Sequence, residues 1–416
     1  MAAQVLEIIG RPRPHPLGLV SVSDFDTSPG AAVDASTILR PQVSLYCIDD
    51  DRRRGIFVEA PEGVDLTAAA FYYQSQFEHA RRLIAVPYED MHRVAAGVGD
   101  PGPRLILLYS TGRCGSTLLS RAFARVPNVV SLPEPDVLTQ LVGLRPTNGS
   151  RDAELRQMAA TCVRLLCKPP GQTFVIKPRS VVIEIADLLH GAFPQSRPIF
   201  LYRNAADVVE SSIKALGPPP TVPDTNTPEG KEQVDRYLSW LRGGTAAALA
   251  RFTAGALRAA VTRGDLRPLK RILRRGAQGT AAEVYSVHWV SIVNRYLALH
   301  RRGIIPAAAR YEDLAARPPH TIAAIFTAVG LSAEAAQDAC RATERDSQEG
   351  SVVSRERAKE TALDERERNV IRQTAAIIAG MHWRIGTPGF VAPGTLGPVE
   401  PDCVPSHARM SPSRCL

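Results

Sequence analysis

The chain has 416 residues, of which 44% are hydrophobic and 22% charged, a globular composition that excludes a wholly disordered or fibrous protein. Its formal net charge of +8 is a mild bias toward anionic ligands, and not the dense basic stripe of a nucleic-acid binder. Seven cysteines without a C-x-x-C pair argue against a disulfide framework or a zinc site.

The first hundred residues predict a small extension. Residues 1–40 are rich in Pro, Gly and Ser and predict an irregular arm. Residues 42–60 predict a hairpin around a charged turn, and residues 67–84 predict a helix with an aromatic face. A Gly/Pro linker at 97–103 marks the first boundary. We therefore expect residues 1–100 to form an extension of one hairpin and one helix.

Strands and helices alternate after this linker. Short apolar runs at 104–110, 174–178 and 197–203 predict strands, and helical patterns lie between them and at 284–301. This alternation predicts an α/β fold, a parallel sheet flanked by helices, over residues 101–385. A Pro/Thr loop and an Arg-rich helical stretch at 217–279 predict an insertion, and residues 386–416 predict a flexible tail.

The most informative segment is LILLYSTGRCGSTLLSRAF, a buried strand that runs through a Gly-containing turn into a helix. Gly112 and Gly115 let the backbone curl, and the helix N-terminus at Ser116 and Thr117 offers free N–H groups to an anion. The guanidinium group of Arg113 adds positive charge and further hydrogen-bond donors. The turn predicts a phosphate or sulfate cradle; the alternative is a plain strand–turn–helix capped by a serine.

The same turn departs from the loop of ATP- and GTP-using enzymes. That loop reads G-x-x-x-x-G-K-[ST], with a lysine on the terminal phosphates. Here Gly115 stands directly before Ser116 and Thr117, where the lysine would be.

The segment STGRCGSTLL resembles the 5′-phosphosulfate loop of sulfotransferases, which use 3′-phosphoadenosine-5′-phosphosulfate (PAPS), release 3′-phosphoadenosine-5′-phosphate (PAP) and need no metal. The resemblance implies a P-loop-type fold and covers roughly residues 104–385. Cys114 replaces the commoner serine. The residues that would hold the phosphosulfate are Thr111, Gly112, Arg113, Cys114, Gly115, Ser116 and Thr117.

Three further segments occur in the order that this family has. FLYRNAADVVESSIKA supplies Arg203 and Ser211 for the 3′-phosphate, although the family's proline is Ala205 here. ARYEDL supplies Tyr311, near the nucleotide or as a plain helix start. DSQEGSVVSRERAK supplies Ser347, with Gly350 and Arg355 as further candidates. Arg203 and Ser211 also fit a solvated strand-end arginine and an ordinary helix serine.

The resemblance also implies catalytic residues. In the tyrosylprotein sulfotransferase-like branch, the nearest in motif form, a glutamate shortly after the first helix is the base. Glu134 stands in that place, with Asp136 as the rival carboxylate. Lys177, in FVIKPRS, would stabilise the bridging oxygen, and Arg113 would grip the transferring group. The histidines at 190, 288 and 300 are interpreted as packing or surface residues.

Three functions compete. The first is sulfuryl transfer from PAPS to a hydroxyl or phenol of a small molecule; the others are an ATP-dependent kinase-like enzyme and a non-catalytic binding module. The aromatic residues Phe71, Tyr72, Tyr73 and Phe77 either line the acceptor pocket or bury the N-terminal helix. No signal-peptide core and no membrane-spanning run is present, so we expect a cytoplasmic protein with no membrane or nucleic-acid partner. The sequence leaves open whether the protein forms a homodimer.

Overall fold

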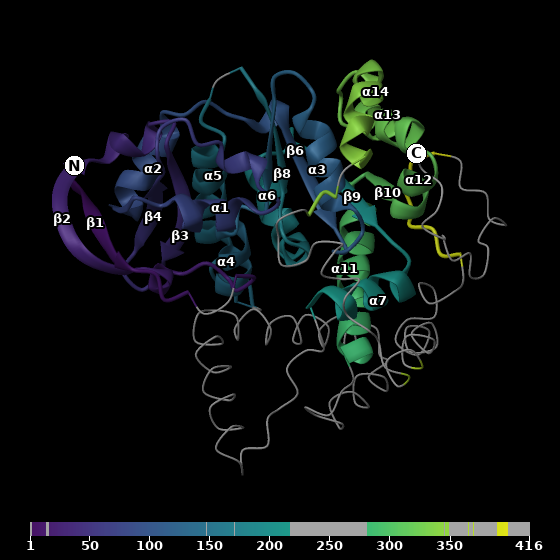
Figure 1. The fold of residues 1–416 in the computed structure, drawn as a ribbon, viewed down its shortest axis with the longest axis horizontal. Helices are drawn as coiled ribbons and strands as arrows, with labels where there is room; N and C mark the ends of the chain where they lie inside the picture. The colour runs from purple at the N-terminus through teal and green to yellow at the C-terminus, as the bar shows by residue number, and fades with distance from the viewer. Residues whose placement is uncertain are drawn as a thin grey trace, which may run out of the picture.

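The computed structural model describes residues 2–216, except 14, 15, 147 and 170, residues 281–348, except 345, and residues 389–397, with the single residues 365 and 369. Within these residues the chain forms two five-stranded sheets, one N-terminal and one central (Figure 1). The predicted insertion at 217–279 lies outside the described residues.

The N-terminal sheet is antiparallel, with strand order β2-β1-β5-β4-β3. Its strands are β1 (Ala2–Gly10), β2 (Asp26–Asp34), β3 (Val43–Asp49), β4 (Arg54–Glu59) and β5 (Arg82–Pro87). Two helices accompany it, α1 (Tyr72–His79) and α2 (Tyr88–Ala96). We call residues 2–96 the N-terminal module.

The predicted hairpin is present as β3 and β4, but two other predictions for this module are wrong. The expected irregular arm contributes strands β1 and β2, and the expected helix over 67–84 ends at His79. Residues 82–87 instead pair with β1 and β4 as the middle strand of the sheet. The buried run of residues 83–86 fits a strand covered on both faces.

The central sheet is wholly parallel, with strand order β10-β9-β6-β8-β7, which confirms the predicted α/β class. Its strands are β6 (Leu105–Ser110), β7 (Val129–Pro133), β8 (Thr173–Lys177), β9 (Arg197–Tyr202) and β10 (Ala307–Arg310). The helices between and after them are α3 (Ser116–Ala124), α4 (Val137–Leu144), α5 (Asp152–Leu166), α6 (Ala186–Ala192), α7 (Ala205–Leu216), α11 (Ala281–Arg301), α12 (Tyr311–Ala316), α13 (Pro318–Ala328) and α14 (Ala336–Ala339). None of the described helices is both long and apolar enough to cross a membrane.

Strand β6 shows how the core is divided. Leu105, Leu107 and Tyr109 join a cluster of buried residues that continues through α4 and α5 into the N-terminal module. Ile106 and Leu108 face a second cluster built with α3 and α13. Because side chains alternate across a strand, one short apolar run fills both faces of the sheet.

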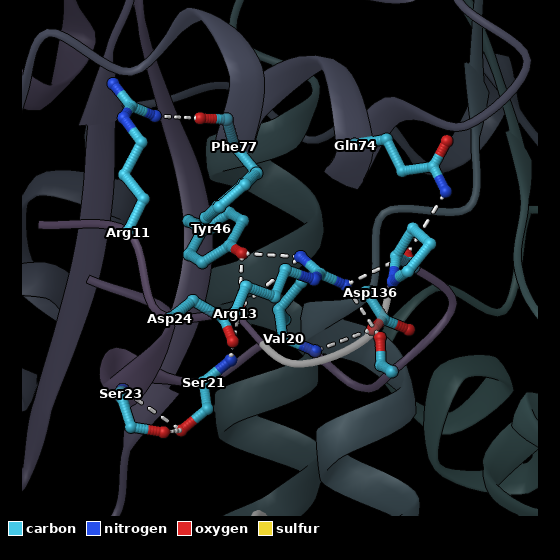
Figure 2. Close-up of polar contacts among 12 residues, drawn as sticks. Arg11, Arg13, Val20, Ser21, Ser23, Asp24, Tyr46, Gln74, Phe77 and Asp136 are labelled. Carbon is cyan, nitrogen blue, oxygen red and sulfur yellow. Dashed lines mark hydrogen bonds and ion pairs between the residues drawn. The ribbon is translucent and has the colours of Figure 1, made fainter.

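Polar side chains also fasten the N-terminal module to the central domain. The Lys168 ammonium donates to the backbone carbonyls of Ile38, Arg40 and Val43. The Asp136 carboxylate accepts from the backbone N–H of Val20 at 3.0 Å, a contact drawn in Figure 2. The module therefore lies against the loop after β7.

Residues 389–397 lie along the outer edge of the central sheet. The backbone N–H of Ala308 donates to the carbonyl of Gly394, and that of Leu396 donates to the carbonyl of Ala308, both at 2.8 Å. Thr395 forms a parallel bridge with Ala308. This segment departs from the flexible tail that was predicted from residue 386; residues 398–416 lie outside the described residues.

Candidate active site

The turn between β6 and α3 has the curled backbone that its sequence predicts. Gly112, Arg113 and Gly115 have φ values of +75°, +49° and +79°, the left-handed region. Helix α3 begins at Ser116, and its N-cap residue, Gly115, has no side chain that could cap it. The first N–H groups of α3 are therefore available to an anion.

Two contacts with neighbouring elements fix the position of the turn. The buried Cys114 thiol contacts the carbonyl of Leu201 at 3.4 Å, and burial raises the pKa of this thiol, so it stays protonated. A Cβ on Gly115 would lie 2.7 Å from the ring of Tyr311. Only glycine fits there, and Tyr311, the first residue of α12, is thereby placed against the turn.

Two arginines meet at the open side of this turn. Arg113 donates to Ser211 Oγ at 3.1 Å and to Gln348 Oε1 at 3.0 Å. Arg203, at the end of β9, donates to the carbonyl of Arg113 at 3.4 Å, and its guanidinium lies 4.6 Å from the Tyr311 ring centroid. Burial, and next the charge of Arg203, lower the pKa of Arg113. Like charges this close in a partly buried place favour a bound anion.

Residues 346–348 lie at the same place. Ser347 is buried, and its neighbour Gln348 accepts the hydrogen bond from Arg113. The Asp346 carboxylate is close enough to raise the pKa of Arg113. Gln348 was missed by sequence reasoning, although it lies in the segment that predicted Ser347. Gly350 and Arg355 lie outside the described residues.

Glu134 and Lys177 form an ion pair at the ends of two neighbouring strands. Strand register places Pro133 of β7 opposite Lys177 of β8, and the Glu134 N–H donates to the Lys177 carbonyl at 2.7 Å. The Lys177 ammonium, almost wholly buried, binds the Glu134 carboxylate. Glu134 has φ +61°, a conformation that non-glycine residues rarely adopt, which aims its side chain at the lysine.

Asp136, the alternative candidate for the base, has different hydrogen-bond partners from Glu134. The Asp136 side chain is completely buried and accepts hydrogen bonds from Val20 N–H and from an Arg179 nitrogen at 3.1 Å. Arg179 also lies 3.9 Å from the Glu134 carboxylate. Asp136 is thus occupied in joining the N-terminal module to β8, whereas the Glu134 carboxylate lies near Arg113 and raises its pKa.

Ser180 and His288, which the sequence analysis did not select as site residues, lie next to the turn. Ser180 Oγ is 3.7 Å from the position of a Cβ on Gly112 and 3.0 Å from His288 Nε2. Burial lowers the pKa of His288 to about 4. His288 was interpreted as a packing or surface residue. The structure places it on α11, where its ring is hydrogen-bonded to Ser180, the residue next to the turn. The only sequence signal was that Ser180 comes three residues after Lys177.

The predicted site residues that the structure describes, a set without Gly350 and Arg355, therefore lie around the carboxyl ends of β6, β7, β8 and β9. Within the described parts of the chain, no group of three or more His, Cys, Asp or Glu side chains could hold a metal ion.

No protein-family model and no curated protein matches the chain. Among solved structures, the crystal structure of a sulfotransferase from Alicyclobacillus acidocaldarius is similar to it, with a TM-score of 0.34 and 13% identity. The match covers 68% of this chain and 96% of that one. Because a likeness this weak decides nothing about activity, the function has to be inferred from the geometry of the site.

Proposed function

We propose that this protein is a sulfotransferase that moves a sulfuryl group from PAPS to a hydroxyl or phenol of a small molecule, with no nucleic-acid or membrane partner. One observation carries the proposal. The paired guanidinium groups of Arg113 and Arg203 lie at a glycine-curled turn, and the Glu134–Lys177 pair lies beside them at the same sheet edge. Anion binding and proton removal are thus combined in one place.

Each half of the donor has residues that fit it. The turn at 111–117 presents N–H groups and hydroxyls to the 5′-phosphosulfate, and Arg113 adds charge. Arg203 would bind the 3′-phosphate; its buried Nε makes no hydrogen bond to a described residue and lies 3.7 Å from the Asp207 carboxylate. Ser211 on α7 accepts a hydrogen bond from Arg113, and Tyr311 would place the nucleotide beside Arg203.

The reaction is an in-line displacement at sulfur. The acceptor oxygen forms a bond to sulfur while the bond from sulfur to the 5′-phosphate oxygen breaks, and PAP leaves. Glu134 takes the proton of the acceptor hydroxyl, and Lys177 stabilises the charge that develops on the bridging oxygen. Their ion pair holds the Glu134 carboxylate next to the ammonium group that would stabilise the bridging oxygen.

Phosphoryl transfer from ATP fits the turn less well. The lysine of ATP-binding loops would stand at Gly115, where even a Cβ would lie 2.7 Å from Tyr311. No observation favours a non-catalytic module over an enzyme.

The proposal is tested by incubating the protein with PAPS and a panel of phenols, sugars and alcohols, and monitoring the mass gain of one sulfo group. PAP should raise the melting temperature of the protein, and Arg203→Ala should remove most of this shift. Arg125→Ala is the matched control, because that arginine lies on the surface and pairs with Asp338. Indifference to millimolar PAP would refute the proposal.

A further inference from the structure

One buried hydroxyl beside the candidate site has no partner among the described residues. The side chain of Tyr73, in α1 of the N-terminal module, is completely buried, and its hydroxyl makes no hydrogen bond to any of them. A hydroxyl removed from water without a partner costs free energy, so native proteins rarely keep one without a reason. The groups around it indicate what that reason is.

Charged groups of the candidate site surround the Tyr73 ring. The guanidinium of Arg179 lies 4.5 Å from its centroid, and that of Arg13 lies 5.2 Å from it. Burial raises the pKa of the Tyr73 phenol, and the carboxylates of Glu134 and Asp136 raise it further. Asp136 is already occupied by Val20 and Arg179. Arg179 links this ring to the proposed base, because its guanidinium lies 4.5 Å from the Tyr73 ring centroid and its Nε lies 3.9 Å from the Glu134 carboxylate.

Phe71 extends this aromatic wall toward Lys177. Its ring centroid lies 5.8 Å from the Lys177 ammonium and 5.8 Å from the Tyr73 ring centroid. Phe71 also occupies the N-cap position of α1, where Ser, Thr, Asp or Asn would satisfy a helix N–H, and no described side chain caps this helix. A phenylalanine here gives up a cap and places a ring at the Glu134–Lys177 pair.

We propose that Tyr73 and Phe71 of the N-terminal module bind a phenolic acceptor, Tyr73 by donating a hydrogen bond to its oxygen and Phe71 by packing against its ring. This inference rests on the proposed function, since it places the acceptor next to Glu134. As the phenolic O–H bond breaks, the proton goes to Glu134 and the oxygen forms its bond to sulfur. Tyr73 stabilises the negative charge on that oxygen until the S–O bond to the 5′-phosphate breaks.

A phenol suits this place better than an aliphatic alcohol for two reasons. Aromatic rings pack against one another in tilted or offset arrangements, which Phe71 and Tyr73 already adopt, with 30° between their planes. A phenolic hydroxyl has a pKa of about 10, so a carboxylate base needs less help to remove its proton than it would from an alkyl alcohol.

The test measures binding of 4-nitrophenol, whose phenolate absorbs visible light, and of PAP, to the full-length protein and two variants. Tyr73→Phe removes only the hydroxyl. Tyr109→Phe is the matched control, because Tyr109 is also fully buried, its hydroxyl likewise makes no hydrogen bond to a described residue, and its charged neighbours are Asp187 and Arg295. Melting temperatures are recorded for all three proteins.

We expect Tyr73→Phe to weaken 4-nitrophenol binding by about tenfold or more, the value of one hydrogen bond to a charged oxygen. It should also shift the bound phenol toward its protonated form, with PAP binding unchanged and a melting temperature equal to or above that of the wild type, because the unpartnered buried hydroxyl is gone. Tyr109→Phe should leave both ligands unaffected. Cyclohexanol should bind no protein of the set measurably.

Each other outcome is decisive. Equal 4-nitrophenol binding by Tyr73→Phe and wild type, or none by wild type, overturns the inference, and the PAP result then judges the proposed function separately. Phenol binding that depends on Tyr73, in a protein that ignores PAP, supports the phenol site and refutes the sulfotransferase. If Tyr73→Phe does not fold, Phe71→Leu takes its place, and unchanged 4-nitrophenol binding by that variant overturns the inference.

Discussion

Charged side chains at strand ends form the candidate site of this molecule. Arg203 and Lys177 close β9 and β8, and each is held by a residue distant in the chain: Arg203 against the turn at Arg113, Lys177 against Glu134. Arg113 was predicted from the glycine-containing turn, and the resemblance to sulfotransferases implied the other three. Gln348 and His288 could not be predicted, because their bonds to Arg113 and Ser180 span 235 and 108 residues.

Glu134→Gln tests the base. The amide keeps the size of the side chain and loses its ability to take a proton, so kcat should fall by about 10²–10⁴-fold. PAP binding should persist, because the turn and Arg203 are unchanged. Steady-state kinetics and calorimetry measure the two effects.

Asp136→Asn is the contrasting variant. Removing this buried charge leaves Arg179 without its closest partner, so the free energy of unfolding should fall by about 3 kcal/mol. Urea denaturation measures this fall. If Asp136→Asn lost kcat and kept its stability, the roles given to the two carboxylates would be reversed.

His288 predicts a loss of stability in mild acid. Its pKa is about 4 in the folded protein and 6.5 when unperturbed, so the unfolded chain binds the proton more tightly. The stabilisation is complete above pH 6.5 and is lost as the pH falls toward 4, by up to roughly 3 kcal/mol. His288→Gln should flatten this part of the curve of unfolding free energy against pH, and a wild-type slope in the variant would contradict the assignment.

At the scale of secondary-structure elements, the turn before α3 needs glycine at two positions, and the reason differs between them. Gly112 and Gly115 have nearly the same left-handed φ, but the nearest atom to a Cβ is 3.7 Å away at Gly112 and 2.7 Å away at Gly115. Sequence reasoning placed both glycines in the turn. The contact with Tyr311 could not be foreseen, since α12 lies almost two hundred residues later.

This difference predicts unequal effects of the same substitution. Gly112→Ala should cost only the left-handed backbone, about 1 kcal/mol. Gly115→Ala should cost more, because it also displaces the Tyr311 ring, and it should abolish PAP binding by moving the turn. Urea denaturation and the PAP-induced thermal shift measure these effects, and equal losses in the two variants would count against the Tyr311 contact.

The N-terminal module shows where local pattern fails. Residues 82–84, the first half of β5, were predicted to be the end of the helix over 67–84. Their pairing with β1 and β4, two strands from earlier in the sequence, decides otherwise. Tertiary pairing overrides local propensity wherever a strand is central to a sheet.

At the scale of the whole molecule, the two sheets share one core. Buried residues continue from the N-terminal module through α4 and α5 to the central sheet. The alternation of strands and helices predicted the central fold correctly. Nothing in the Pro/Gly-rich composition after residue 386 predicted the packing of residues 389–397.

This C-terminal segment gives a prediction for the whole fold. A chain ending at residue 388 would lose the hydrogen bonds to Ala308 and the contacts of Ala392 and Thr395 with Tyr202, and would uncover β10. Compared with a chain ending at residue 397, it should melt several degrees lower. Calorimetry of the two proteins measures this, and equal melting temperatures would show that the segment does not stabilise the sheet.

The adjacent positive charges of Arg113 and Arg203 have a practical consequence at the bench. Repulsion between them is relieved by any small oxyanion, so inorganic phosphate or sulfate in a buffer will occupy the same place that a nucleotide would need. By mass action, affinities measured in such buffers will come out too weak in proportion to the salt present. Preparations exchanged into a zwitterionic sulfonate-free buffer are therefore the ones in which a weak ligand will first become visible.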